Sequence, residues 1–165
     1  MLFRSNITWT ATDKITLGAN LIGGPTQNNN LGNKRVVADL VSTIKPVDRL
    51  TVYLNYDWGH EDQAGLAGTG AIWQGLAAAA TYNVTDRFTA AGRIEFLNDF
   101  DGARTGIGQR VWEYTLTWKY LITQHLYTQL ELREDFSTED AFQKDDSDVR
   151  DTNPLVSVSL TYLFL

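Results

Sequence analysis

The sequence predicts an all-β protein, a transmembrane antiparallel up-and-down β-barrel, from three observations. Apolar and polar residues alternate over segments of ten to twelve residues, which matches the roughly 9–11 residues of a tilted strand that crosses a bilayer. Aromatic residues stand at the ends of the apolar side of several segments, and short turns alternate with long polar connections. A soluble β-sandwich also alternates, but its strands are mostly about five or six residues long. Strand length, aromatic ends and unequal connections therefore decide the fold class.

Four similar short turns divide the chain at a nearly constant interval. Their matching residues Asp13, Asp48, Asp86 and Gln124 are spaced 35, 38 and 38 residues apart. Asp favours tight turns because its side chain bonds the backbone that follows it. Long polar connections lie between these turns, so we expect short turns at one end of the sheet and long loops at the other. Nine strands follow, near residues 2–11, 15–24, 35–45, 50–59, 71–82, 88–98, 110–120, 125–136 and 154–164.

One side of each predicted strand is apolar, and in several strands it ends in aromatic residues. The segment 110–120 shows the pattern, with Leu116 between Trp and Tyr residues on the same side. Aliphatic centres with aromatic ends are typical of the lipid-facing band and interfacial girdles of outer-membrane barrels. The girdle residues that we expect to face lipid are Trp9, Trp58, Trp112, Trp118, Tyr120, Tyr162 and Phe164.

The opposite side of the strands is polar and is expected to face a water-filled lumen. This side carries five basic residues, of which Arg35 is one, and six acidic residues. It therefore has little net bias toward one sign of charge. Rings of one sign select ions, whereas part of this mixed pattern is explained by pairing of charges across neighbouring strands. The candidate pore-lining residues are Arg4, Asp39, Asp57, Arg93, Glu95, Glu113, Lys119, Glu131, Arg133 and Asp135.

The composition argues against several other functions. No Cys is present, which excludes disulfides and thiolate chemistry. His60 and His125 fall at opposite ends of the predicted sheet, so we expect no metal site, no cofactor and no enzyme. A net charge of −6 argues against nucleic acid, which needs a basic surface. The longest apolar run, 76–80, is far too short for a membrane helix.

Two acidic segments are open to more than one interpretation. Residues 99–102 resemble half of a calcium-binding loop but lack its downstream Glu, and we interpret them as a loop turn. Residues 137–153 contain six acidic and two basic side chains. This segment is either a solvated loop, an electrostatic guard at the pore mouth, or a place for divalent cations near lipopolysaccharide.

Three stretches resemble the OmpL-like β-barrel porin family of Gram-negative bacteria: residues 40–59, 80–106 and 115–137. The resemblance covers most of the chain from about Leu17 onward. Its most specific part is Glu95-Phe96, Asp99, Asp101-Gly102 and Thr105-Gly106. The resemblance implies an outer-membrane porin without catalytic residues. Family members are usually much longer, so the chain resembles their C-terminal part, and its ending SLTYLF is similar to the last strand that the barrel-assembly machinery reads.

The function expected from these features is a water-filled channel for passive diffusion of small hydrophilic solutes or ions across the bacterial outer membrane. The alternative is a structural barrel that acts as a scaffold or sheath for envelope partners. Expected partners are outer-membrane lipid, lipopolysaccharide and, through the C-terminal strand, the barrel-assembly machinery. The sequence shows no interface signature, so a homo-oligomer is left open.

Residues 1–165 are expected to be a single transmembrane β-barrel domain or the C-terminal portion of one. The first and ninth predicted strands run in the same direction, so they would pair only in parallel, whereas single-chain bacterial barrels hold an even number of antiparallel strands. We therefore expect upstream strands, or a wall supplied by another chain or copy.

Overall fold

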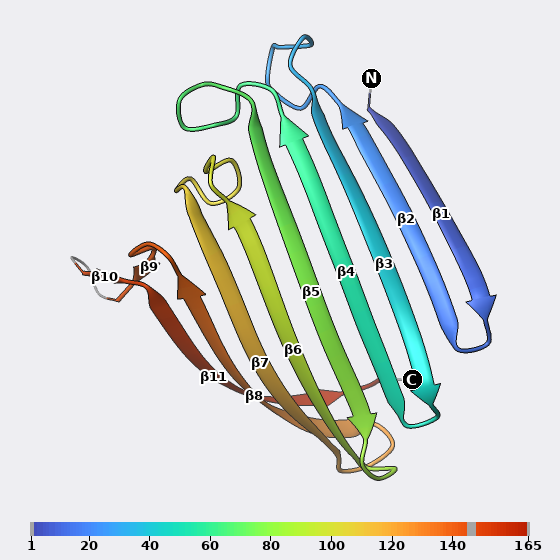
Figure 1. The fold of residues 1–165 in the computed structure, drawn as a ribbon. Coiled ribbons are helices and arrows are strands. Elements are labelled where there is room, and N and C mark those ends of the chain that lie inside the picture. The colour runs from blue at the N-terminus through green and yellow to red at the C-terminus, as the bar shows by residue number, and fades with distance from the viewer. Residues whose placement is uncertain (1, 145–147, 165) are drawn as a thin grey trace.

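A single antiparallel sheet of nine long strands dominates the computed structural model, which describes residues 2–144 and 148–164. The strands lie in chain order and form a curved wall (Figure 1). They are β1 (Phe3–Thr12), β2 (Ile15–Gly24), β3 (Arg35–Val47), β4 (Leu50–Glu61), β5 (Ala71–Asn83), β6 (Phe88–Asp99), β7 (Gln109–Leu121), β8 (Leu126–Ser137) and β11 (Thr152–Tyr162). No helix of the described residues is long and apolar enough to cross a membrane.

The predicted fold class and strand positions agree with this sheet. The observed strands begin and end within about two residues of the predicted ones. One feature is additional: within the acidic segment, β9 (Phe142–Gln143) pairs with β10 (Val149–Arg150) as a second, two-stranded sheet. Strands of two residues are too short to show an alternating pattern, which explains why the sequence did not reveal them. Asp145 and Asp146 of the acidic segment lie outside the described residues.

Threonine side chains hold three of the short turns. The Thr12 hydroxyl accepts a hydrogen bond from the Lys14 N–H at 3.1 Å, and the Thr85 hydroxyl accepts one from the Phe88 N–H at 3.0 Å. Thr123 does the same for the His125 N–H at 3.3 Å. In the turns of Thr12 and Thr85, the sequence predicts this bond from the following residue, Asp13 or Asp86. A hydroxyl one position earlier reaches the same backbone donors, so the Thr closes these turns instead.

The sheet has one polar and one apolar face, because neighbouring residues of a strand point to opposite sides. The register keeps each face uniform across strands: Leu54 lies opposite Ala78, and Asn55 lies opposite Ala77. The polar face carries Asn20, Asp39, Asp57, Glu95, Glu113 and Arg133 at alternate positions, and the apolar face carries Leu40, Leu54, Leu76, Ile94, Leu116 and Leu132.

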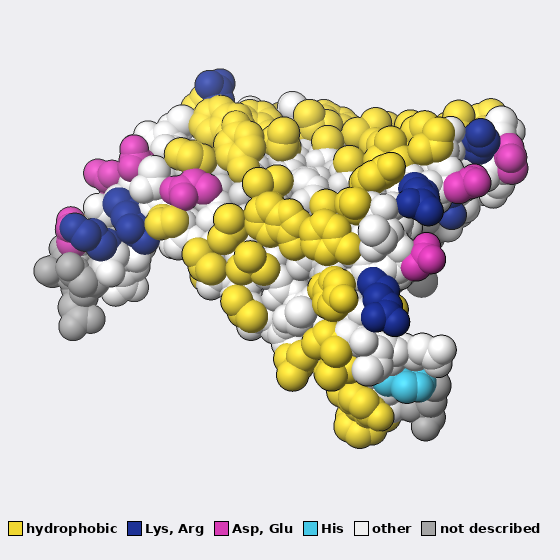
Figure 2. Space-filling view, turned by 90° about the horizontal axis from the view of Figure 1, so that it is seen from below, with side chains coloured by type: hydrophobic (Ala, Val, Ile, Leu, Met, Phe, Trp, Pro, Cys, Tyr) yellow, Lys and Arg dark blue, Asp and Glu magenta, His cyan; other side chains and the backbone are white. Residues whose placement is uncertain are grey.

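Burial is inverted relative to a soluble protein. Among the described residues, the buried hydrophobic side chains are Ala71 and Trp73, whereas six buried residues are polar or charged. Glu113 is 6% exposed, but Leu116 three positions along the same strand is 52% exposed. Seen from the short-turn end, hydrophobic side chains form a broad band with most charged side chains toward its margins (Figure 2). The sheet therefore curls toward its polar face and leaves the apolar face without a covering layer.

The sheet is open, with β1 and β11 as its two edges. β1 begins at the long-loop end and β11 ends at the short-turn end, so the two edge strands run in the same direction (Figure 1). That direction agrees with the predicted path of the chain. Whether further strands complete the wall stays a prediction.

The two faces give a direct test at neighbouring positions. Leu54→Arg places a charge on the apolar face near the middle of β4 and should cost about 2–4 kcal/mol of folding free energy if that face meets lipid. Asn55→Arg, one residue away on the polar face, should leave the free energy of folding nearly unchanged. Urea unfolding from lipid vesicles measures both. Equal damage from the two substitutions would contradict the assignment of the faces.

Candidate functional site

Strands β6, β7 and β8 bring five charged residues together on the polar face. Glu95, Glu113 and Asp135 lie directly opposite one another in register, and Arg93, Thr115 and Arg133 form the adjacent row. Arg93 Nη2 lies 2.5 Å from Glu113 Oε1, and Arg133 Nη2 lies 2.8 Å from Glu113 Oε2. The outer carboxylates complete the group, because Arg93 Nε lies 3.2 Å from Glu95 and Arg133 Nε lies 2.8 Å from Asp135.

This charge cluster (Arg93, Glu95, Glu113, Arg133 and Asp135) is internally paired. Like charges directly opposite each other in a sheet are destabilising, and a row of three carboxylates would be unfavourable alone. The two guanidinium groups lie beside them and bridge the row through Glu113, whose side chain is 7% exposed. The cluster thus braces three neighbouring strands on the polar face.

A second polar group crosses β1 to β4 and contains no cation. Asn6 donates to the side-chain oxygen of Asn20, and Asn20 in turn donates to Asp39. Asn55 donates to the other carboxylate oxygen of Asp39. Asp57 lies directly opposite Asp39 in register. Among the described residues, neither carboxylate takes part in an ion pair.

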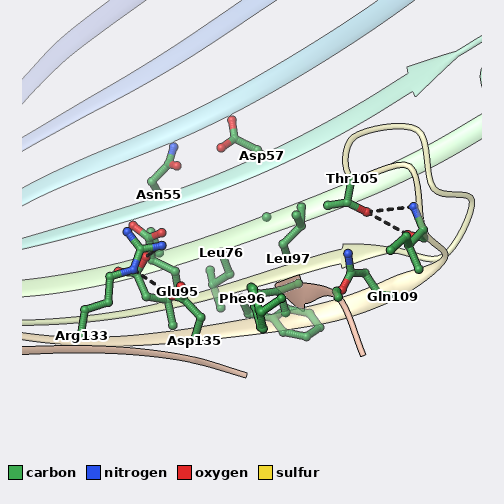
Figure 3. Close-up of a pocket in the computed structure, with 17 residues that line it drawn as sticks. Asn55, Asp57, Leu76, Glu95, Phe96, Leu97, Thr105, Gln109, Arg133 and Asp135 are labelled. Carbon is green, nitrogen blue, oxygen red and sulfur yellow. Dashed lines mark hydrogen bonds and ion pairs between the residues drawn. The ribbon is translucent and has the colours of Figure 1, made fainter. Parts of the chain in front are cut away.

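Small side chains on β5 separate the two groups. Gly75, Ala77 and Ala79 occupy the polar face there, and Gly75 and Ala77 line a cavity of about 590 Å³ between β4 and β8. In Figure 3, Asn55 and Asp57 stand on one side of this space and Glu95, Arg133 and Asp135 on the other. At the long-loop end, Ile107 and Phe142 also line the cavity, so β9 of the acidic segment lies at its mouth.

The long loops around the cavity mouth interlock. In the loop after β4, the Leu66 N–H donates to the Asp101 carbonyl at 3.0 Å, and its side chain lies against Gly102 and Gly108. The Asp101 carboxylate accepts the Ile72 N–H at 2.9 Å. The fully buried Asp99 accepts the N–H groups of Arg104 and Thr105 at 2.9 and 2.7 Å. The first long loop joins them, since Gln27 donates to the Asp62 carbonyl at 2.7 Å.

The segment 99–102 therefore orders a loop. Its acids bond backbone donors of the loop and of β5. No group of three or more His, Asp or Glu side chains that could hold a metal occurs among the described residues.

Trp73 is a buried aromatic residue at this end of the polar face that the sequence analysis did not single out. Its ring centroid lies 6.0 Å from the guanidinium carbon of Arg35 and 5.3 Å from that of Arg104. Arg35 also pairs with Glu61 at 2.5 Å. Glycine at position 59 makes room, because a Cβ there would lie 2.1 Å from ring carbons of Trp73. The alternation of residues 71–76 indicates that Trp73 belongs to the polar face, because it lies on the same side of the strand as Ala71 and Gly75.

Comparison with known proteins decides the family. The family model described as "Putative beta-barrel porin-2, OmpL-like" matches residues 2–164. The chain belongs to this OmpL-like porin family. The description of this family names a porin.

Two solved structures are similar to this OmpL-like porin chain. One is the outer membrane channel DcaP of Acinetobacter baumannii, with a TM-score of 0.70 and 12% identity over 96% of this chain and 51% of that one. The other is the NanC porin, with a TM-score of 0.67 and 12% identity over 99% of this chain and 78% of that one. The chain thus spans about half the length of the DcaP chain. At such low identity the likeness establishes the fold. No curated protein matches the sequence.

The predicted girdle residues that lie within strands of the porin chain belong to its apolar face, and Phe164 lies just past the end of β11. Trp58 and Trp112 lie toward the long-loop end, and the Trp112 ring is 5.2 Å from that of Phe96. At the short-turn end, Tyr162 and Phe164 stack edge to face at 4.8 Å. Trp9, Trp118 and Tyr120 are also toward the short-turn end. Contact with lipid stays a prediction for this set.

Five of the ten predicted pore-lining residues form the charge cluster, and Asp39 and Asp57 form the cation-free group. The other three lie apart on the polar face. Arg4 is exposed on the edge strand β1. Lys119 lies 4.0 Å from the Tyr127 ring centroid, and Glu131 accepts a hydrogen bond from Thr117 at 3.2 Å.

The close approach of Trp73 to Gly59 predicts a site-specific clash. Gly59→Ala should destabilise the porin by about 1–3 kcal/mol, because the ring must shift to admit the methyl group. In a Trp73→Ala background the same substitution should cost much less, which urea unfolding of the four proteins measures as a double-mutant cycle.

Gly75→Ala is the matched control. Its added Cβ would meet Asp57 Cβ at 3.6 Å, an ordinary contact, so stability should change little. An equal cost for Gly59→Ala with and without Trp73 would contradict the clash.

Proposed function

We propose that the protein is an outer-membrane porin whose polar face lines a water-filled channel for passive diffusion of small hydrophilic solutes or ions. The observation that carries this proposal is the inverted burial of the sheet. Charged side chains such as Glu113 and Asp135 are buried on the inner side of the curve, while large apolar side chains on the other side are open. Hydrocarbon is the solvent in which such an apolar surface is stable.

The bacterial outer membrane is the proposed location. Membership of a porin family and the likeness to DcaP and NanC support it. The apolar face with its aromatic ends would contact outer-membrane lipid and lipopolysaccharide. We further propose that the barrel-assembly machinery recognises the last strand, in which Val156, Val158, Leu160, Tyr162 and Phe164 repeat at alternate positions.

A closed barrel requires further strands in addition to these nine. Unpaired N–H and C=O groups at the edges of β1 and β11 would be costly in hydrocarbon. The two edges run in the same direction, so an odd number of additional strands would allow antiparallel pairing at every seam. We propose that the chain is the C-terminal portion of such a larger barrel. A second copy inserted in the same orientation would close the wall only through parallel seams.

The open apolar face predicts how the protein behaves in solution. The purified protein should aggregate in plain buffer and become monodisperse in detergent, because the exposed leucines and aromatic residues need an apolar environment. Circular dichroism should show a β-rich spectrum, and gel migration in detergent should change on heating. A monodisperse, stable monomer in buffer without detergent would refute the membrane assignment.

Channel activity is tested by conductance. The complete barrel, with the additional strands proposed above, should give stepwise, ohmic current in potassium chloride when inserted into a planar bilayer, because water and ions would fill the space beside β5. The heat-denatured protein at the same concentration is the control. Insertion without current would instead favour the structural barrel that serves as a scaffold or sheath.

A further inference from the structure

We propose that Asp39 and Asp57 make the channel prefer cations over anions, while the charge cluster of β6 to β8 contributes little to that preference. The proposal rests on the proposed channel function and goes beyond it by assigning ion preference to two named residues. Counting charges on the polar face does not reveal this, because the face is nearly balanced in sign. The distinction comes from which charges are paired.

The charge cluster cancels most of its own field. Each of its five members lies within 3.2 Å of an opposite charge. The potential of closely spaced opposite charges falls off within a few ångströms, and salt screens what remains beyond about 8–10 Å. The three carboxylates and two guanidinium groups of the cluster leave a net charge of only one negative unit. An ion in the lumen therefore meets mainly the local dipoles of the ion pairs.

Asp39 and Asp57 lack such compensation. Both partners that hold Asp39, Asn20 and Asn55, are neutral amides. The neighbouring strands add no charge either, because the polar face of β2 presents Thr16, Gly18, Asn20 and Ile22, and that of β5 presents Ala71, Trp73, Gly75, Ala77, Ala79 and Thr81. The nearest basic residue along β3, Arg35, is paired with Glu61.

The register strengthens the effect of the two carboxylates. Directly opposite like charges repel each other, so a mobile cation near Asp39 and Asp57 would relieve a repulsion that no basic side chain among the described residues neutralises. The cavity of about 590 Å³ opens beside Asp57 over the low surface of Gly75 and Ala77. A hydrated cation can therefore approach Asp57 without displacing protein (Figure 3).

The size of the effect follows from the potential at the channel wall. Charged walls of low dielectric raise the local concentration of ions of opposite sign. A change of about one kT in that potential alters the ratio of cation to anion concentration about sevenfold. Removing two uncompensated carboxylates should therefore change selectivity several-fold without changing the width of the channel, because Asn and Asp have nearly the same shape.

Reversal potentials across a planar bilayer with a tenfold gradient of potassium chloride test the proposal. The native protein should favour potassium over chloride. In Asp39→Asn/Asp57→Asn the permeability ratio of potassium to chloride should fall several-fold, with single-channel conductance retained. The single variant Asp57→Asn should move the ratio in the same direction by a smaller amount, and it serves if the double variant inserts poorly.

The matched control removes an ion pair from the charge cluster. Arg133→Gln/Asp135→Asn also changes two residues of the polar face, but it leaves the net charge unchanged and leaves Glu113 paired with Arg93. Its permeability ratio should stay close to the native value. An unchanged ratio in both aspartate variants, or an equal shift in the control, would overturn the proposal. A native protein without any conductance would instead overturn the channel function on which it rests.

Discussion

The antiparallel hydrogen-bond ladder is the constraint on which the other features of this structure depend. A strand in hydrocarbon has no water to bond its backbone, so neighbouring strands must pair along their whole length. The same ladder fixes which side chains meet. Glu113 lies between Glu95 and Asp135 because β7 lies between β6 and β8 in this register. The three adjacent carboxylates repel one another, so Arg93 and Arg133 in the next row are needed to neutralise them.

The faces of the sheet were predictable because they depend only on alternation within each strand. Trp118 and Lys119 are neighbours in sequence, and alternation alone predicts them on opposite sides, as the register has them. Strand positions were predictable for a similar reason, since turn residues such as Asp86 interrupt the alternation. Even there the chemistry was assigned to the wrong side chain, because Thr85 and not Asp86 bonds the following N–H. Both signals are local, since the Thr85 hydroxyl accepts from an N–H only three residues further on.

Pairing between distant residues could not be predicted in the same way. That Asp39 lies opposite Asp57 depends on the geometry of the turn between β3 and β4, where the register shifts between Ile44 and Val47. The contact of Leu66 with Gly102 joins two loops through their folded shapes, and no spacing in the sequence encodes it. The distinction between paired and unpaired charges therefore required the structure, although every residue concerned had been named.

The small side chains of β5 have a consequence for molecular sieving. Gly75, Ala77 and Ala79 form no ion pair, and they take part in the hydrogen-bond ladder through their backbones alone. A bulkier residue at Gly75 or Ala77 would project into the cavity of about 590 Å³ and narrow it while the carboxylates on either side kept their partners. In the proposed channel, the size limit for solutes and the preference for their charge would thus be set on different strands, and mutation could change one while the other stays as it is.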